Sequence, residues 1–91
     1  MFEVKYQGCR IAPSYSAIRE LMKEGKTLED VKEILELGGD APRKRKEGTI
    51  EKWFNIGNKT YNAVVVKDFN EILEEEVWLL IHFGKHTKFN K

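Results

Sequence analysis

The chain has 91 residues, of which 41% are hydrophobic, with 2 Trp, 3 Tyr and 5 Phe. This composition supports one modest core in a single domain and argues against a disordered chain. The formal net charge is only +1, so any affinity for nucleic acid must come from local patches and not from bulk charge. The small size favours a homo-oligomer, because association covers apolar surface that a thin sheet leaves open.

Cysteine usage and hydropathy point to the compartment. Cys9 is the only cysteine, which excludes an intramolecular disulfide and a thiolate zinc cage. No apolar run approaches the roughly 20 residues that span a bilayer, and no signal peptide opens the chain. We therefore expect a cytoplasmic protein with no membrane partner. Twelve Lys and twelve Glu against a single Gln resemble the composition of heat-adapted proteins.

The first part of the chain predicts a strand and a helix. Residues 2–6 alternate apolar and polar side chains, as a half-buried strand does. Ser14 or Ser16 is placed to cap a helix that Gly25 ends in the left-handed conformation. The helix is expected to bury one face, formed by Ile18, Leu21 and Met22.

A second helix follows directly. Thr27 and Asp30 form a capping box, and Gly38-Gly39 stop the helix. Its apolar stripe consists of Leu28, Val31, Ile34 and Leu35. The short link predicts an antiparallel helical hairpin packed on a sheet.

The strongest pattern is a β-hairpin preceded by four cations at 43–46. Residues 49–56 and 60–66 flank Gly57-Asn58, which suits a type II′ turn. The resulting register pairs Phe54 with Tyr61 and Ile50 with Val65 on one face, and Trp53 with Asn62 on the other. A slip of one residue would exchange the two faces.

The last third predicts one helical turn and one buried strand. Asp68 and Glu71 resemble a second capping box, with Ile72-Leu73 on the inner side of the turn. Residues 77–83 are almost continuously apolar, as in a central strand covered on both faces. Gly84 ends this strand, and 85–91 form a basic tail. The expected fold is one α+β domain over 1–91, a β-α-α-β-β-β two-layer arrangement whose antiparallel-rich sheet is covered on one face by the helical hairpin.

This order resembles the RelE/ParE toxin superfamily. Residues 16–18, Ser-Ala-Ile, and residues 24–31, Glu-Gly-Lys-Thr-Leu-Glu-Asp-Val, more specifically resemble an uncharacterised family of small prokaryotic domains near those toxins. In that family a His-Ala pair opens the first helix, and an Arg-Gly pair precedes a Thr-x-Glu-Asp-Val helix start. The resemblance covers residues 14–83 and implies a RelE-like domain that is either an RNA- or ribosome-directed toxin or a relative without enzymatic activity.

The chain departs from the family at polar positions. Ser16 stands where the family usually has histidine, and Glu20 and Glu24 stand where arginines are common. If those residues carry the activity of the family, this chain has lost or moved it. A shared fold does not settle the question, because one fold serves many functions.

The cations and aromatics suggest a nucleic-acid surface. The candidates for phosphate binding or base stacking are Arg43, Lys44, Arg45, Lys46, Lys52, Trp53, Lys85 and Lys88. The alternative for the 43–46 cluster is a solvated loop whose charges protect a sheet edge. The alternative for Trp53, and the favoured role of Tyr61, is ordinary sheet packing.

The two histidines suggest acid–base chemistry. His86 follows the predicted strand and is the better catalytic candidate, with Arg45 as the electrostatic stabiliser in RNA cleavage by the 2′-OH. His82 lies in an apolar strand, which favours a hydrogen-bonded structural histidine. On a strand the two residues are roughly 13 Å apart and no third ligand is obvious, so no metal or cofactor is expected.

Two functions are therefore open. The first is binding of RNA or ribosome, with metal-independent cleavage and an antitoxin-like protein as partner. The second is a non-catalytic, homodimeric interaction module whose hairpin edge or apolar helix face recognises a protein.

Overall fold

The computed structural model describes residues 4–41 and 46–87. Within these ranges the chain forms two helices and a sheet of six strands. In chain order they are β1 (Lys5–Tyr6), β2 (Cys9–Pro13), α1 (Tyr15–Glu24), α2 (Leu28–Leu37), β3 (Gly39–Asp40), β4 (Thr49–Ile56), β5 (Lys59–Asn70) and β6 (Glu75–Thr87). The α+β class predicted from the sequence is confirmed.

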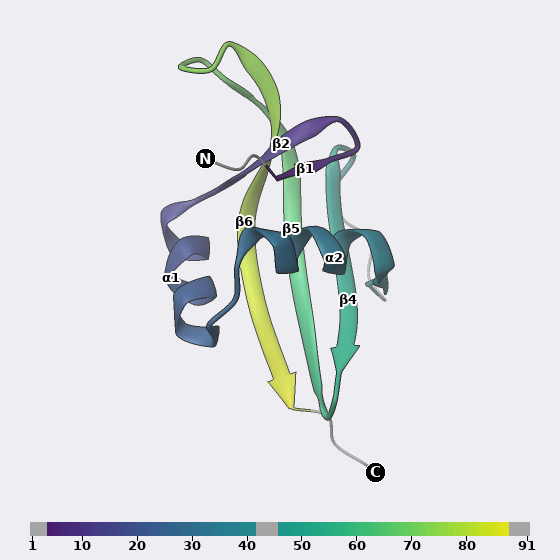
Figure 1. The fold of residues 1–91 in the computed structure, drawn as a ribbon. Helices are drawn as coiled ribbons and strands as arrows, with labels where there is room; N and C mark the ends of the chain where they lie inside the picture. The colour runs from purple at the N-terminus through teal and green to yellow at the C-terminus, as the bar shows by residue number, and fades with distance from the viewer. Residues whose placement is uncertain (1–3, 42–45, 88–91) are drawn as a thin grey trace.

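The sheet is mixed and has the order β1-β2-β6-β5-β4-β3 (Figure 1). Only β2 and β6 are parallel, and every other neighbouring pair is antiparallel. The chain order differs from the predicted β-α-α-β-β-β. Gln7 and Gly8 both have a positive φ and fold the chain back, so β2, and not β1, is the strand that pairs with β6.

The β4–β5 hairpin forms in the predicted register. Ile50 pairs with Val65, Trp53 with Asn62, and Phe54 with Tyr61. Gly57 has a φ of +64°, whereas Asn58 has no positive φ, as a type II′ turn requires. The turn chemistry and the period of the apolar residues were therefore sufficient to place this hairpin.

A bulge in β6 changes which of its side chains face the helices. Val64 pairs with His82 but Val65 pairs with Leu80, so Ile81 is an extra residue without a partner on β5. Side chains before Ile81 therefore follow one alternation and those after it follow the other. Leu80 and Phe83, three positions apart, both reach the core.

Both helices are capped as predicted. Ser14 Oγ accepts a hydrogen bond from Ala17 N at 3.2 Å, and Thr27 and Asp30 form the reciprocal capping box. Gly25 ends α1 with a φ of +66°. Neither described helix has the length and apolar content needed to cross a membrane.

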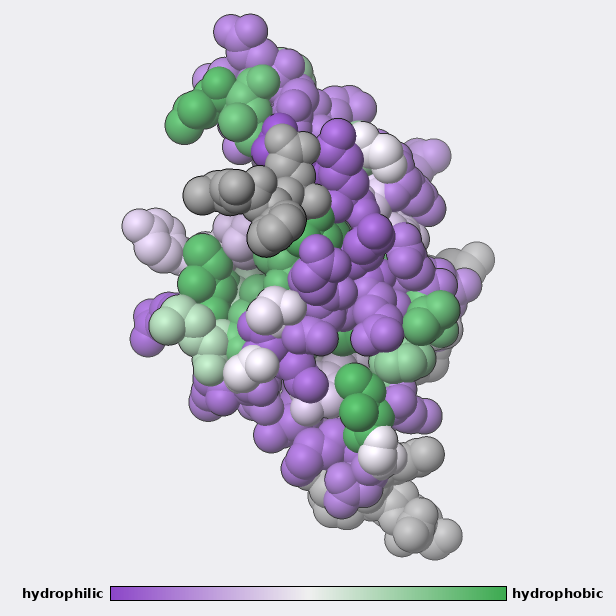
Figure 2. All heavy atoms as spheres, in the orientation of Figure 1, coloured by the Kyte–Doolittle hydropathy of each residue, from purple (hydrophilic) through white to green (hydrophobic). Residues whose placement is uncertain are grey.

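The predicted buried face of α1 is only partly right. Leu21 and Ala17 are buried, but Met22 is 75% exposed and Ile18 is 38% exposed. The helix lies along the side of the sheet, whereas α2 crosses in front of β5 and β4 (Figure 1). A helix at the side of a sheet buries a narrower stripe, and apolar side chains remain visible over α1 in Figure 2.

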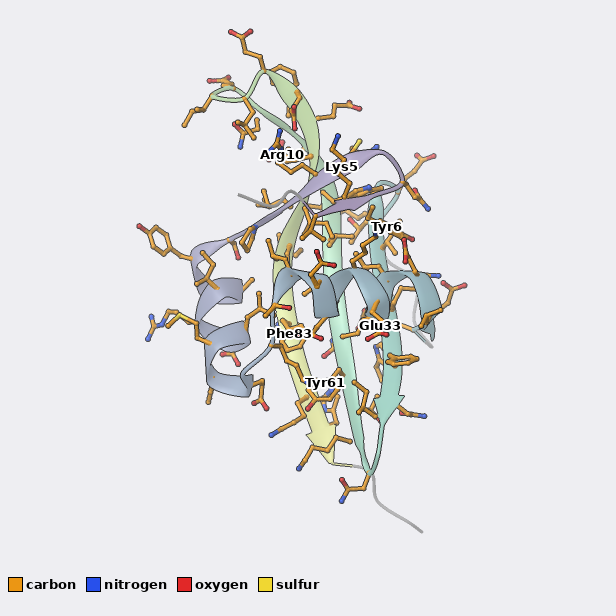
Figure 3. All side chains as sticks on the ribbon, in the orientation of Figure 1. Lys5, Tyr6, Arg10, Glu33, Tyr61 and Phe83 are labelled. Carbon is orange, nitrogen blue, oxygen red and sulfur yellow. The ribbon has the colours of Figure 1, made fainter. Side chains whose placement is uncertain are left out.

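The core lies between the helices and one face of the sheet. It combines the stripe of α2 with inward side chains of β5 and β6, among which the Tyr61 and Phe83 rings stack with centroids 5.9 Å apart (Figure 3). The buried members are Val4, Tyr6, Ile11, Ala17, Leu21, Val31, Ile34, Leu35, Tyr61, Ala63, Val65, Trp78, Leu80 and Phe83. In the described structure no helix covers the other face of the sheet, which we call the helix-free face.

The predicted helical turn at 68–73 is wrong. Asp68, Phe69 and Asn70 continue β5 and pair with β6, and only residues 71–74 form the turn. Cross-strand pairing outweighs the local capping pattern here. Residues 68–76 therefore form a hairpin that projects beyond the other strands, and we call this hairpin the arm (Figure 1).

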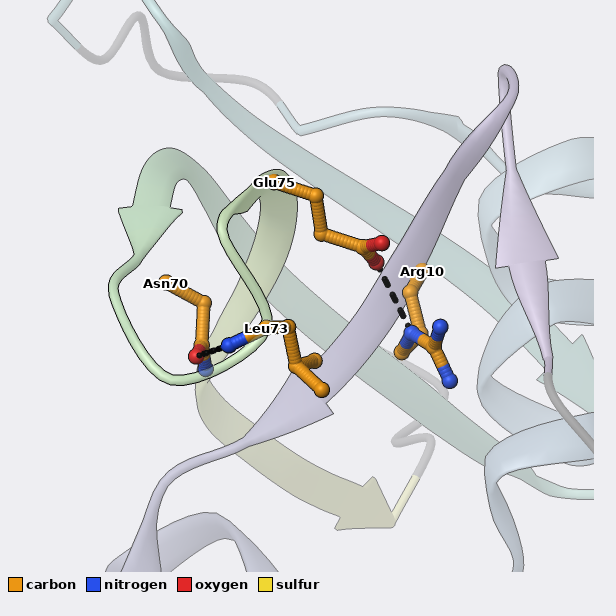
Figure 4. A network of polar contacts seen from close by, with 4 residues as sticks. All are labelled: Arg10, Asn70, Leu73 and Glu75. Atoms are coloured by element: carbon orange, nitrogen blue, oxygen red, sulfur yellow. Dashed lines mark hydrogen bonds and ion pairs between the residues drawn. The ribbon is translucent and has the colours of Figure 1, made fainter.

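Polar contacts hold the arm at Asn70 and Glu75, the paired residues on either side of its turn (Figure 4). Leu73 N donates to Asn70 Oδ1 at 2.9 Å and closes the turn. Arg10 Nε lies 2.8 Å from Glu75 Oε2, and this hydrogen bond lowers the pKa of Glu75 below its ordinary value. The arm is thus tied to β2 through Glu75, the first residue of β6.

Gly38 provides a test of helix-to-sheet packing. A Cβ at Gly38 would lie 2.5 Å from Ile34 O and 2.7 Å from Trp53 O, whereas a Cβ at Gly39 has nothing within 4 Å. Gly38→Ala is expected to lower the free energy of unfolding by about 1–3 kcal/mol, because backbone atoms must shift. Gly39→Ala is the matched control in urea denaturation, and equal effects of the two substitutions would contradict the packing.

Candidate functional site

The helix-free face carries a cluster of polar and aromatic side chains near the middle of the sheet. Glu51 and Trp53 come from β4, Asn62 from β5, and His82 and His86 from β6. The hairpin register and the bulge bring these five residues onto one face. We refer to them as the polar cluster.

Glu51 is the centre of the polar cluster. Its Oε2 accepts hydrogen bonds from Trp53 Nε1 at 2.8 Å and from Asn62 Nδ2 at 3.2 Å. Glu51 is only 6% exposed and Asn62 only 3%. Both donors bind the same carboxyl oxygen, and the hydrogen bond from Nε1 fixes the orientation of the Trp53 indole.

Trp53 and His86 present neighbouring rings on this face. Their centroids are 5.9 Å apart and their planes are inclined by 35°. Trp53 is half-buried and His86 is exposed. The pair therefore offers aromatic surface to solvent beside an imidazole, the side chain most often used as a general acid or base.

Gly84 leaves space for His82 to bend along the strand. A Cβ at Gly84 would lie 3.0 Å from His82 Nε2 and 2.7 Å from Asn62 Oδ1. The His82 imidazole thus lies over Gly84, which is midway between the two histidines and roughly 6.6 Å from each along the strand. The exposed position of His82 does not fit the structural role expected from the sequence.

Asn62 has one polar atom that is not satisfied. Its Oδ1 is buried and accepts no hydrogen bond in the described structure, although its Nδ2 is held by Glu51. Buried acceptors of this kind are uncommon in native proteins and mark positions that need an explanation.

Two of the predicted cations lie on the other side of the sheet. Lys52 pairs with Ala63 on the helix-bearing face, and its Nζ is 2.5 Å from Asp40 Oδ1. Lys85 Nζ lies 2.8 Å from Glu24 Oε1 of α1, and this hydrogen bond raises the pKa of Lys85. Both cations are therefore engaged by carboxylates and face away from Trp53 and His86.

The described strand residues nearest the two predicted basic segments pair with distant positions of β5. Lys46 precedes Thr49, which pairs with Val66, whereas the C-terminal segment follows Thr87, which pairs with Lys59. Seven residues of strand separate these pairings, about 23 Å. Lys46 is exposed. Arg43, Lys44, Arg45 and Lys88 lie outside the described residues.

Metal binding finds no support in the described part of the chain. Over residues 4–41 and 46–87, no group of three or more His, Cys, Asp and Glu side chains is arranged to hold a metal ion.

The sequence predicted Trp53 and His86 as site residues, but it did not lead to a prediction of Glu51 and Asn62. The signal was present in the hairpin register, since Glu51 and Trp53 alternate on one face and Asn62 is opposite Trp53. An acidic side chain and an amide side chain share this strand face with an indole N–H. When such groups are buried, they are expected to hydrogen-bond to one another.

Comparison with known proteins leaves the geometry as the main guide. No protein-family model, curated protein or solved structure matches the chain. The chemistry of the site therefore has to be argued from its own side chains. These provide an aromatic platform, two imidazoles and an unsatisfied amide oxygen.

Glu51 is expected to be the residue on which the polar cluster depends. Glu51→Ala removes the acceptor of two donors, so the free energy of unfolding should fall by about 1–3 kcal/mol in urea denaturation. The matched control is Glu47→Ala at an exposed position just before β4, which should change it by less than about 0.5 kcal/mol. Similar values for the two variants would show that the Glu51 hydrogen bonds contribute no net stability.

Proposed function

We propose that the chain is a cytoplasmic, RelE-like domain that binds single-stranded RNA on its helix-free face and cleaves it without a metal. The observation that carries the proposal is the Trp53–His86 ring pair, held in place by Glu51. An indole of fixed orientation is a stacking platform for a base. A histidine beside that platform lies within reach of the sugar and phosphate of the stacked nucleotide.

The cleavage step uses the two imidazoles. One imidazole removes the proton of the 2′-OH, whose oxygen attacks the adjacent phosphorus and forms a 2′,3′-cyclic phosphate. The P–O5′ bond breaks, and the protonated imidazole of the other histidine gives its proton to the leaving 5′ oxygen. His86 is next to the base platform, and the His82 imidazole bends along the strand to Gly84, two residues before His86.

The residues proposed to bind phosphate are predicted from the sequence and not from the described contacts. Lys46 is exposed and available for it, and Arg45 stays the predicted electrostatic stabiliser of the transition state. Lys52 and Lys85 contribute only if they leave Asp40 and Glu24. Under this proposal, a neutralising protein partner would act by covering the helix-free face.

The stacking role of Trp53 is tested by binding. Trp53→Ala should weaken the affinity for a fluorescein-labelled single-stranded RNA by about ten-fold or more, since base stacking contributes about 1–3 kcal/mol. Tyr15→Ala is the matched control, because Tyr15 is an exposed aromatic residue on α1. Fluorescence anisotropy at several salt concentrations gives both the affinity and the number of phosphates contacted. Equal affinities of wild type and Trp53→Ala would refute RNA binding at this face.

The catalytic role of His86 needs a separate measurement. His86→Ala should abolish release of the 2′,3′-cyclic phosphate product in buffer that contains EDTA, while RNA affinity falls only slightly. His82→Ala should lower the rate as well, because it removes the second proton-transfer group. Undiminished cleavage by His86→Ala would exclude His86 from the mechanism, and a protein that binds RNA without cleaving it would leave only the binding function.

A further inference from the structure

The tip of the arm is apolar and strongly exposed. Ile72 is 93% exposed, Phe69 56% and Leu73 43%. Residues 68–76 also contain one Asp and four Glu, with no Lys or Arg. The arm therefore presents an apolar tip surrounded by carboxylates, and Figure 2 shows its green side chains at the end of the molecule.

A second exposed apolar surface lies on α1. Tyr15, Ile18 and Met22 are three and four residues apart, so they form one stripe along the helix. Each residue of a helix turns by about 100°, so Arg19 and Lys23 occupy the adjoining strip. Arg19 and Lys23 also line a surface depression of about 430 Å³ with Ser16 and Glu20. The outer surface of α1 is thus apolar with a cationic border.

These two surfaces are complementary in character and in charge. Carboxylates around the arm tip repel RNA and anionic membranes, which leaves a protein surface as the occupant. Such a surface must combine exposed apolar side chains with cations. The α1 stripe has both, and one chain carries arm and stripe on the same side of the molecule (Figure 2).

We propose that two copies of the chain form a dimer in which the arm tip of each copy docks on the α1 stripe of the other. Ile72, Phe69 and Leu73 pack against Tyr15, Ile18 and Met22, while Glu71 and Glu74 lie near Arg19 and Lys23. A twofold axis between arm and helix produces two equal contacts and closes the assembly. The dimer does not depend on RNA binding, because the arm and α1 lie apart from the polar cluster.

Sedimentation velocity from micromolar to millimolar protein tests the dimer. The wild-type chain should sediment as a dimer of 10.6 kDa subunits. Ile72→Asp and Met22→Asp should each raise the dimer dissociation constant by at least about ten-fold, since each buries a charge in both contacts. Both residues are exposed in the single chain, so neither change threatens the fold. The matched control is Ile56→Asp, at an exposed apolar residue by the β4–β5 turn, which should leave the dimer unchanged.

Mixing the two variants identifies the pairing. A heterodimer of Ile72→Asp with Met22→Asp keeps one contact entirely wild type, because the intact arm of one copy meets the intact helix of the other. The mixture should therefore dimerise at least about ten-fold more tightly than either variant alone. A monomeric wild type, variants that dimerise like wild type, or a mixture no tighter than its components would each overturn the proposal.

Discussion

The pairing of β5 with β6, and the single bulge within it, is the constraint on which the rest of the structure depends. Twelve residues of β5 pair with β6, which makes this the longest contact in the sheet. The bulge at Ile81 shifts the alternation of β6 by one residue. Phe83 then joins the core beneath the helices, and His82 and His86 turn to the helix-free face. Without the bulge, the alternation that buries Leu80 would turn both histidines toward the helices.

The two faces of the sheet consequently have different chemistry. On the helix-bearing face, the cations Lys52 and Lys85 are held by carboxylates of neighbouring elements. On the helix-free face, a buried carboxylate holds Trp53 and Asn62 in position. Side chains on central strands are fixed more firmly than side chains on loops, which is what a binding or catalytic group needs. The proposed RNA site uses this rigidity.

The same strand pair also creates the arm, because β5 and β6 continue after β2 and β4 have ended. Beyond that point no neighbour covers the hairpin, so its apolar residues stay exposed unless another molecule covers them. Exposed apolar residues at a tip, bordered by carboxylates, are typical of an interaction surface. A domain of this size buries only a modest apolar core, so covering the exposed apolar tip in a dimer adds to its stability.

The sequence by itself determined the local elements: the Thr27–Asp30 capping box, the Gly57-Asn58 turn, the β4–β5 register and the α+β class. These depend on residues close together in the chain, where propensity and periodicity act directly. Tertiary structure decided the extension of β5 to Asn70, the exposure of Met22 and the face on which His82 and His86 lie. Strand pairing with β6 overrides the capping pattern at Asp68. Met22 is exposed because a helix at the side of a sheet buries only a narrow stripe. The histidines face away from the helices because pairing with β5 determines the position of the bulge. All three depend on contacts between distant residues, which local patterns do not encode.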